Sequence, residues 1–117
     1  DSFPDCLAKM KIKFFCYSFA HYGISSMKTL PSVFYKMADL RKLRITGTSI
    51  KTLEAQVRNW RKLECLVISN NPYLVLLPEE IKCLKKLRLL VLPKGFPETE
   101  FEKVKKWLPH CKIVRGT

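Results

Sequence analysis

The chain repeats one apolar pattern three times, and this repeat limits the possible folds more than any other feature. The pattern is a leucine, two residues, a second leucine, one residue, and then an isoleucine or leucine. It occurs at residues 40–45, 63–68 and 87–92, so the copies begin 23 and 24 residues apart. A period of about 20–29 residues with this spacing is typical of a solenoid in which each unit contributes one short strand.

The spacing within each copy has a physical reason. Alternate side chains of a strand point to opposite faces, so Leu43 and Ile45 can face the same core. One unit cannot bury that face alone, whereas stacked neighbours form a continuous core. We therefore predict an α/β solenoid in which the strands of stacked units share one core. Three in-phase copies disfavour a chance arrangement of leucines in an ordinary α/β domain.

Each strand is followed by a segment that can return the chain to the start of the next strand. These segments cover residues 27–37, 53–60 and 77–84. In the third, Pro78 can begin a helix with Glu79 and Glu80 in the first turn, which suits the helix dipole. The sequence Asn70-Asn71-Pro72 follows the strand at 63–68, and asparagine side chains there can bond to the backbone of a turn.

The first strand lies in the aromatic segment from Lys11 to Ile24, but its register is open. The distance to Leu30-Pro31 places Cys16, Phe19 and His21 inward. Hydrophobicity favours a register two residues earlier, with Phe14, Tyr17 and Phe19 inward.

The C-terminal segment departs from the period and is predicted to cover the end of the core. Thr99 and Glu102 fit a capping box at a helix start. Apolar residues then recur at helical spacing on one face, namely Phe101, Val104, Trp107 and Leu108. A short final strand is expected around Cys111, Ile113 and Val114.

The length of 117 residues predicts one domain, residues 1–117. We divide it into an N-terminal cap at 1–15, about four repeats at 16–95 and a C-terminal cap at 96–117. No apolar run is long enough to span a bilayer, which predicts a soluble chain. Because the sequence begins at Asp1 without an initiator methionine, we interpret it as a mature or trimmed chain whose targeting segment is not visible.

The charge balance is strongly basic. Lysine and arginine number 22 against 10 acidic residues, which gives a net charge of +12. This favours contact with anionic partners, although lysines also simply solubilise the outer positions of a solenoid. The five cysteines form no CxxC motif and no metal-ligand spacing, so we expect no metal and a reduced state. They are Cys6, Cys16, Cys65, Cys83 and Cys111.

Three stretches of the chain resemble a known family. The patterns LxxLxIxxTxIxxL, LPEEIKCLKKL and EFEKVKKWLPHCKI are similar to bacterial leucine-rich repeat proteins with short, plant-like repeats, which are abundant in spirochaetes. The resemblance covers residues 27–114 and departs from the family pattern at Thr48, Glu54 and Gly95. It implies an α/β fold, a right-handed curved solenoid with a parallel sheet inside the curve and short helices or turns outside. It also implies a protein-binding role, often secreted or at the cell surface, but it does not identify a partner.

In this architecture the non-core positions of the strands form the concave contact surface. A basic edge there surrounds an apolar centre, a mixture typical of protein-recognition surfaces, although a solvated sheet face without a ligand is the alternative. The predicted partner-binding residues are Arg41, Lys42, Arg44, Glu64, Cys65, Val67, Arg88, Leu89 and Val91. The same positions also include Thr46, Ser69 and Lys94.

An enzyme is not expected, because the sequence contains no phosphate loop, no paired carboxylates and no Ser-His-Asp arrangement. We expect no cofactor and no small-molecule substrate. The predicted function is a non-enzymatic protein–protein interaction module. The alternative is electrostatic binding to an anionic surface or polymer, such as polysaccharide, membrane headgroups or nucleic acid. Self-association is a further expectation, because the repeats are few and the N-terminal end is partly polar. Cys65 and Cys83 are candidates for cross-linking two molecules or reacting with oxidants.

Overall fold

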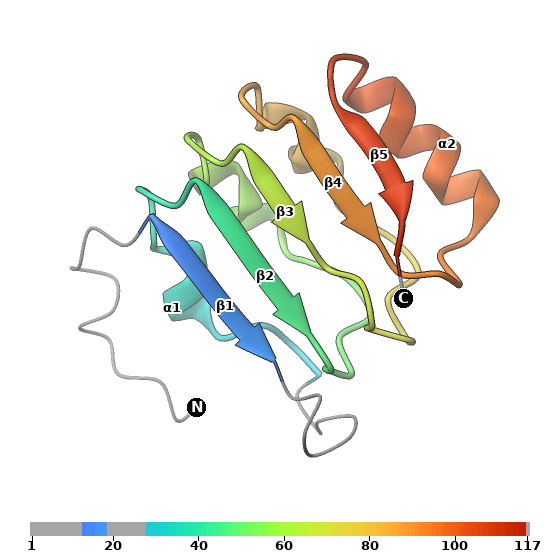
Figure 1. Ribbon diagram of the computed structural model, residues 1–117, viewed down its shortest axis with the longest axis horizontal. Coiled ribbons are helices and arrows are strands. Elements are labelled where there is room, and N and C mark those ends of the chain that lie inside the picture. Colours follow the sequence, from blue (N-terminus) through green and yellow to red (C-terminus); the bar gives the residue numbers. More distant parts are fainter. Residues whose placement is uncertain (1–12, 19–27, 117) are drawn as a thin grey trace.

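The computed structural model describes residues 13–18 and 28–116, with only the backbone described at 15–18. Its strands form one parallel sheet in the order β1-β2-β3-β4-β5, which is also the order of the sequence (Figure 1). Their bounds are Phe14–Ser18 (β1), Lys42–Thr46 (β2), Cys65–Val67 (β3), Leu89–Leu92 (β4) and Lys112–Arg115 (β5). The predicted parallel sheet is therefore confirmed.

The sheet register copies the sequence repeat. Leu43 of β2 pairs with Leu66 of β3, and Leu66 pairs with Leu90 of β4. These leucines occupy the same position of the three copies, so each unit lies directly beside the preceding one. The interval of 23 or 24 residues is thus the length of chain needed to leave one strand, cross behind the sheet and begin the next.

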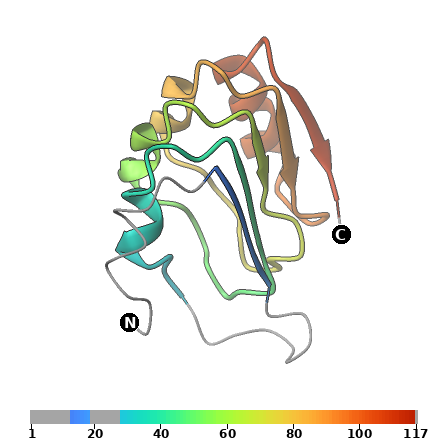
Figure 2. The same cartoon turned by 60° about the vertical axis from the view of Figure 1, so that its left-hand side comes forward.

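The helices all lie behind one face of the sheet, and the other face carries no helix of the described chain (Figures 1 and 2). They are α1 at Ser32–Tyr35, the 3₁₀ helices η3 at Ala55–Asn59 and η4 at Glu79–Cys83, and α2 at Glu98–Trp107. As predicted, η4 begins after Pro78 with Glu79 and Glu80 in its first turn. The short lengths of the first three helices follow from the short repeat.

The core fills the space between the sheet and the helices. Each unit contributes inward side chains from its strand and from its return segment, as the repeat predicts. In the second unit, for example, Trp60 is fully buried, stacks on Tyr35 with ring centroids 5.3 Å apart, and donates its indole N–H to the Phe34 carbonyl at 2.8 Å. Adjacent units are therefore joined by directional contacts as well as by apolar packing.

A buried asparagine joins the turns that follow β2 and β3. Asn71 Oδ1 accepts hydrogen bonds from Thr48 N at 3.0 Å and Thr48 Oγ1 at 2.6 Å. Its Nδ2 donates to the carbonyls of Ile45 at 2.9 Å, Ile68 at 2.7 Å and Ser69 at 3.1 Å. The predicted role of an asparagine in this turn is confirmed, and the bonds to Thr48 and Ile45 extend it to the preceding unit.

The backbone of these two turns repeats as well. Gly47 and Asn70 occupy equivalent places and both have positive φ, 74° and 56°. The Gly47 amide donates to the Asn70 carbonyl at 2.9 Å. Glycine and asparagine are the residues that adopt this conformation at low cost, which explains their presence here.

Both predicted registers of the first strand are wrong. Phe15 pairs with Leu43, and Tyr17 pairs with Ile45. The inward positions of the strand therefore begin two residues closer to the N-terminus than in the earlier of the two predicted registers. Phe14, which that register placed inward, is 62% exposed. Several aromatic residues occur in succession here, and hydrophobicity alone cannot choose among registers that differ by two residues. Phe19 and His21 lie outside the described residues.

The C-terminal segment forms the predicted helix and strand, but the capping box is wrong. Pro97 is the N-cap of α2, and no side chain caps the helix there. Thr99 lies inside the helix, because the fixed φ of Pro97 sets the helix start two residues earlier. Phe101, Val104 and Leu108 are buried as the helical spacing predicts, and Trp107 packs against the core.

Candidate functional site

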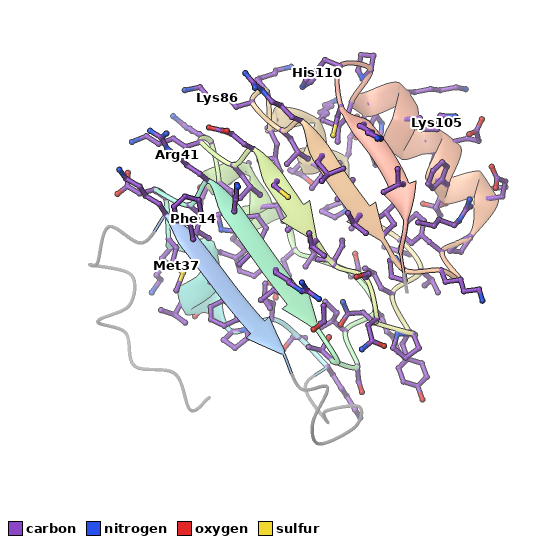
Figure 3. All side chains as sticks on the ribbon, in the orientation of Figure 1. Phe14, Met37, Arg41, Lys86, Lys105 and His110 are labelled. Carbon is purple, nitrogen blue, oxygen red and sulfur yellow. The ribbon has the colours of Figure 1, made fainter. Side chains whose placement is uncertain are left out.

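The candidate site is the face of the sheet opposite the helices, which we call the open face (Figure 3). It is built from the strand positions that alternate with the buried leucines and isoleucines. The register aligns these positions into two rows across the sheet. The first row is Phe14, Lys42, Cys65, Leu89 and Lys112, and the second is Cys16, Arg44, Val67, Val91 and Val114.

The predicted contact residues divide into two groups by exposure. The cationic residues Arg41, Lys42, Arg44 and Arg88 are exposed. The residues Glu64, Cys65, Val67, Leu89 and Val91 are half-buried. The structure thus brings the predicted apolar centre together on β3 and β4, and it places Lys42 and Arg44 beside it on β2.

Residues immediately before the strands extend the site along the end of the sheet where the strands begin. The Glu64 amide donates to the Arg41 carbonyl at 2.7 Å, and the Arg88 amide donates to the Glu64 carbonyl at the same distance. These backbone bonds align the three residues in neighbouring units. Figure 3 labels Arg41, Lys86 and His110 at this end of the sheet, where the strands begin.

The predicted contacts did not include Phe14, Lys112 or Val114 of the open face. Phe14 is exposed, and the Lys42 ammonium lies 5.5 Å from the centre of its ring, a cation–π distance. Lys112 and Val114 of β5 continue the two rows beyond β4. The signal for β5 was present in the sequence, because Ile113 follows Leu90 by 23 residues and so continues the period.

Two other predicted positions are not available for contact. Thr46 and Ser69 are buried at 4% and 7% exposure. Ser69 is covered because the chain end passes over it: a Cβ on Gly116 would lie 2.9 Å from Ser69 Cβ and 2.8 Å from Val91 Cγ1. Lys94 is exposed in the turn after β4, where it lines a hollow of about 170 Å³ with Asn70 and its neighbours.

Burial disfavours the thiolate form of the two half-buried cysteines near the open face. Burial raises the pKa of Cys65, although the nearby Lys42 ammonium opposes this. Burial raises the pKa of Cys111 to about 11, and the charge of Cys65 adds to the shift. A thiol reacts as its thiolate, so these cysteines are less suited to oxidation or cross-linking than Cys83, which is exposed on η4.

The described residues contain no group of three or more side chains that would hold a metal ion. In the same part of the chain, no helix has the length and apolar character needed to cross a membrane.

Comparison with known proteins gives a structural relative. No family model matches the chain, and no characterised protein matches its sequence. The solved structure of a leucine-rich repeat protein from Leptospira interrogans aligns with a TM-score of 0.59 and 26% identity. The alignment covers 96% of this chain and 33% of that protein, so the chain spans about a third of its length. The fold is leucine-rich-repeat-like.

This relationship supports a fold of the leucine-rich-repeat type for this chain. Such folds are typically non-enzymatic binding modules.

Proposed function

We propose that the protein is a non-enzymatic module that binds a protein partner through the open face. The face would be the concave side of a right-handed solenoid of about four repeats at 16–95, with caps at 1–15 and 96–117. We further propose that the repeats are of the short, plant-like bacterial type and that the protein acts in secreted or cell-surface form, as the resemblance over residues 27–114 suggests.

The observation that carries the proposal is the half-buried apolar centre of the open face. Cys65, Val67, Leu89, Val91 and Val114 adjoin one another across three strands, and no helix of the described chain covers them. Burying such side chains in a partner gives about 25 cal/mol for each Å² removed from water. Apolar anchors surrounded by charged residues are the usual arrangement of a protein interface.

The cations beside this centre indicate the character of the partner. Arg41, Lys42 and Arg44 lie on one side and Lys112 on the other, and all four are exposed. An arginine side chain binds a carboxylate with two parallel hydrogen bonds, so the proposed partner presents an apolar patch with acidic residues around it. A second copy of this chain fits less well, because its own open face carries the same positive charges.

The test is charge reversal on the open face. A partner is first captured from a proteome at ~0.15 M and ~0.5 M salt, because the higher concentration strongly screens surface charge. Its affinity is then measured for the variant Arg41→Glu, Arg44→Glu, Arg88→Glu. The matched control is Lys103→Glu, Lys105→Glu, Lys106→Glu, which changes the charge equally on the exposed side of α2.

We expect the open-face variant to lose about tenfold or more in affinity, equivalent to roughly 1.4 kcal/mol, and the control to bind nearly as well as the wild type. Equal binding by both variants would remove the open face as the contact surface. Captured material that disappears at the higher salt would instead support the alternative, electrostatic attachment to an anionic surface or polymer, which the net charge of +12 favours.

A further inference from the structure

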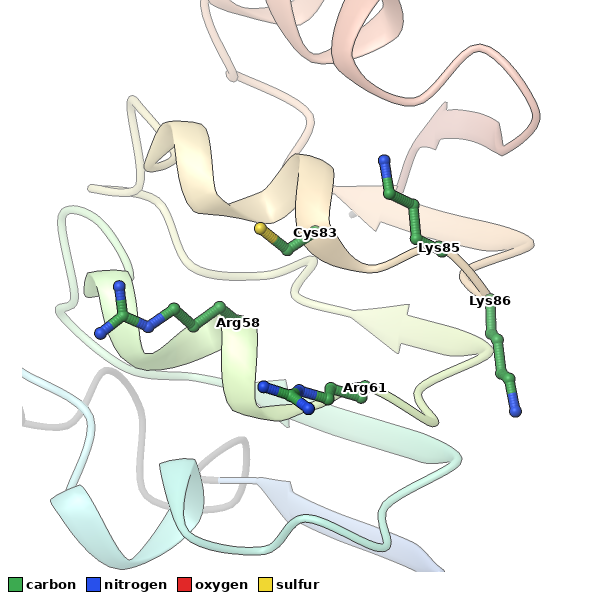
Figure 4. Close-up of a pocket in the computed structure, with 5 residues that line it drawn as sticks. All are labelled: Arg58, Arg61, Cys83, Lys85 and Lys86. Carbon is green, nitrogen blue, oxygen red and sulfur yellow. The ribbon is translucent and has the colours of Figure 1, made fainter.

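A second cationic surface lies away from the open face, where the return segments of the second and third units meet. It contains a hollow of about 290 Å³ lined by Arg58, Arg61, Cys83, Lys85 and Lys86 (Figure 4). Arg58 belongs to η3 and Arg61 follows it, whereas Lys85 and Lys86 follow η4. Two successive repeats therefore contribute two cations each, and no carboxylate of the described residues lines the hollow.

A second hollow continues this surface toward the edge where the strands begin. It has a volume of about 430 Å³ and shares Lys85 and Lys86 with the first. Its other lining residues are Glu64, Arg88 and His110. We call the two hollows together the return-side patch; its lining includes five arginine and lysine side chains and one carboxylate.

No cation of this patch forms an ion pair with another described residue. The ion pairs among the described residues join Lys62, Lys82, Lys103, Lys105 and Arg115 to acidic partners, and none includes a patch residue. The contrast is clear at one repeat position. Lys62 lies 2.9 Å from Asp39, whereas Lys86, 24 residues later, has no carboxylate partner among the described residues. Unpaired like charges repel, and an external anion relieves that repulsion.

The lining also indicates which polyanion fits. Among the described residues, no phenylalanine, tyrosine or tryptophan lines either hollow, so the patch lacks the stacking surfaces by which proteins typically bind single-stranded nucleic acid. No large apolar side chain in that part of the chain lines them either, so nothing described there would insert into a membrane surface. The cations follow successive repeats, and arginine binds planar or tetrahedral oxyanions through two hydrogen bonds.

We propose that the return-side patch binds a sulfated polysaccharide, with its sulfate groups seated against the cations of successive units. Because the two hollows share Lys85 and Lys86, one polysaccharide chain can run from the return segments to the end of the sheet where the strands begin. Glu64 and Arg88 adjoin both surfaces, whereas Arg58, Arg61, Lys85 and Lys86 are not among the open-face residues. A variant restricted to these four cations therefore tests the patch without changing the open face.

The experiment measures the affinity of the whole chain for heparin by calorimetry at ~0.15 M salt. The patch variant is Arg61→Gln, Lys85→Gln, Lys86→Gln, and the control variant is Lys103→Gln, Lys105→Gln, Lys106→Gln. Both variants remove three positive charges from exposed positions. Circular dichroism verifies folding, and Lys86→Gln alone replaces the patch variant if its spectrum changes.

We expect the patch variant to bind heparin about tenfold more weakly and the control to lose less than about threefold. Desulfated heparin should bind weakly to the wild type. Equal losses in the two variants would overturn the proposal, because net charge alone would then explain binding. Patch-dependent binding that is tighter for duplex DNA or for phosphatidylserine vesicles would overturn it as well, because the ligand would belong to another class.

Discussion

Replacing Asn71 with alanine tests how the repeats are joined. The side chain is fully buried and connects two neighbouring units by accepting from Thr48 and donating to backbone carbonyls, including that of Ile45. Alanine removes all of these bonds at once. The Thr48 amide is then left in the interior without its acceptor, and a buried unsatisfied group costs more than a lost bond at the surface.

The expected cost follows from the number of bonds. Each hydrogen bond contributes about 1 kcal/mol net, and a buried group left unsatisfied costs about 1–3 kcal/mol. We therefore expect Asn71→Ala to lower the free energy of unfolding by about 3–5 kcal/mol. This is a large part of the ~5–15 kcal/mol typical of a domain. The corresponding fall in Tm is about 10–20 °C for a chain of this size.

The assay is urea unfolding followed by circular dichroism, with Asn59→Ala as the control. Asn59 is exposed at the end of η3, so its replacement should change stability by less than about 0.5 kcal/mol. A double-mutant cycle with Thr48→Val should give a coupling of about 1 kcal/mol between the two side chains. A loss below about 1 kcal/mol for Asn71→Ala would refute the view that this asparagine joins the units.

Three further predictions concern individual side chains and their burial. Trp60→Phe should lower the free energy of unfolding by about 1–2 kcal/mol, because it removes the 2.8 Å hydrogen bond from the indole N–H to the Phe34 carbonyl of α1. Denaturant unfolding measures this loss. Burial raises the pKa of Tyr35 to about 12, above the ordinary value of about 10, so the folded state retains the phenolic proton and stability should fall between about pH 10 and pH 12. Tyr35→Phe should abolish that part of the pH dependence in unfolding experiments. The third prediction concerns alkylation near pH 8, followed by peptide mass spectrometry. The exposed Cys83 should react before Cys65 and Cys111, because burial raises the pKa values of the latter two thiols. Faster reaction of Cys65 would contradict the burial of that thiol on the open face.

The parts of the fold that the sequence predicts are those that recur. Leu43, Leu66 and Leu90 are read from the period and pair directly in the sheet. The same period places Val67 and Val91 on the opposite face, because strand side chains alternate. Because the pattern recurs, the core positions assigned in one unit can be compared with those of the other units. A shift of one residue in any unit would break the agreement among them.

The parts that were wrong depend on contacts that do not recur. The register of β1 is set by pairing with β2, and the sequence before Leu30 offers several aromatic residues at alternate positions. The start of α2 is set by Pro97 rather than by the side chain of Thr99. The burial of Ser69 depends on the path of the last residues of the chain over it. A local pattern contains no information about such contacts.

The return-side patch was not predicted for a related reason. Lysines and arginines occur throughout the sequence, and a count cannot show which are paired with carboxylates. Arg61 and Lys85 become neighbours only because successive return segments stack, and Lys62 differs from Lys86 only because Asp39 lies beside it. The distribution of charge therefore required the structure.

The most direct test of the open-face proposal is site-specific photo-crosslinking. A photoreactive amino acid is placed at Val67, in the apolar centre of the open face, and separately at Gln56, which is exposed on η3 behind the sheet. Each protein is mixed with the captured partner and irradiated at ~0.5 M salt, where weak charge attraction is screened. We predict that the partner is cross-linked from position 67 and not from position 56. Cross-linking from position 56 alone would contradict binding through the open face.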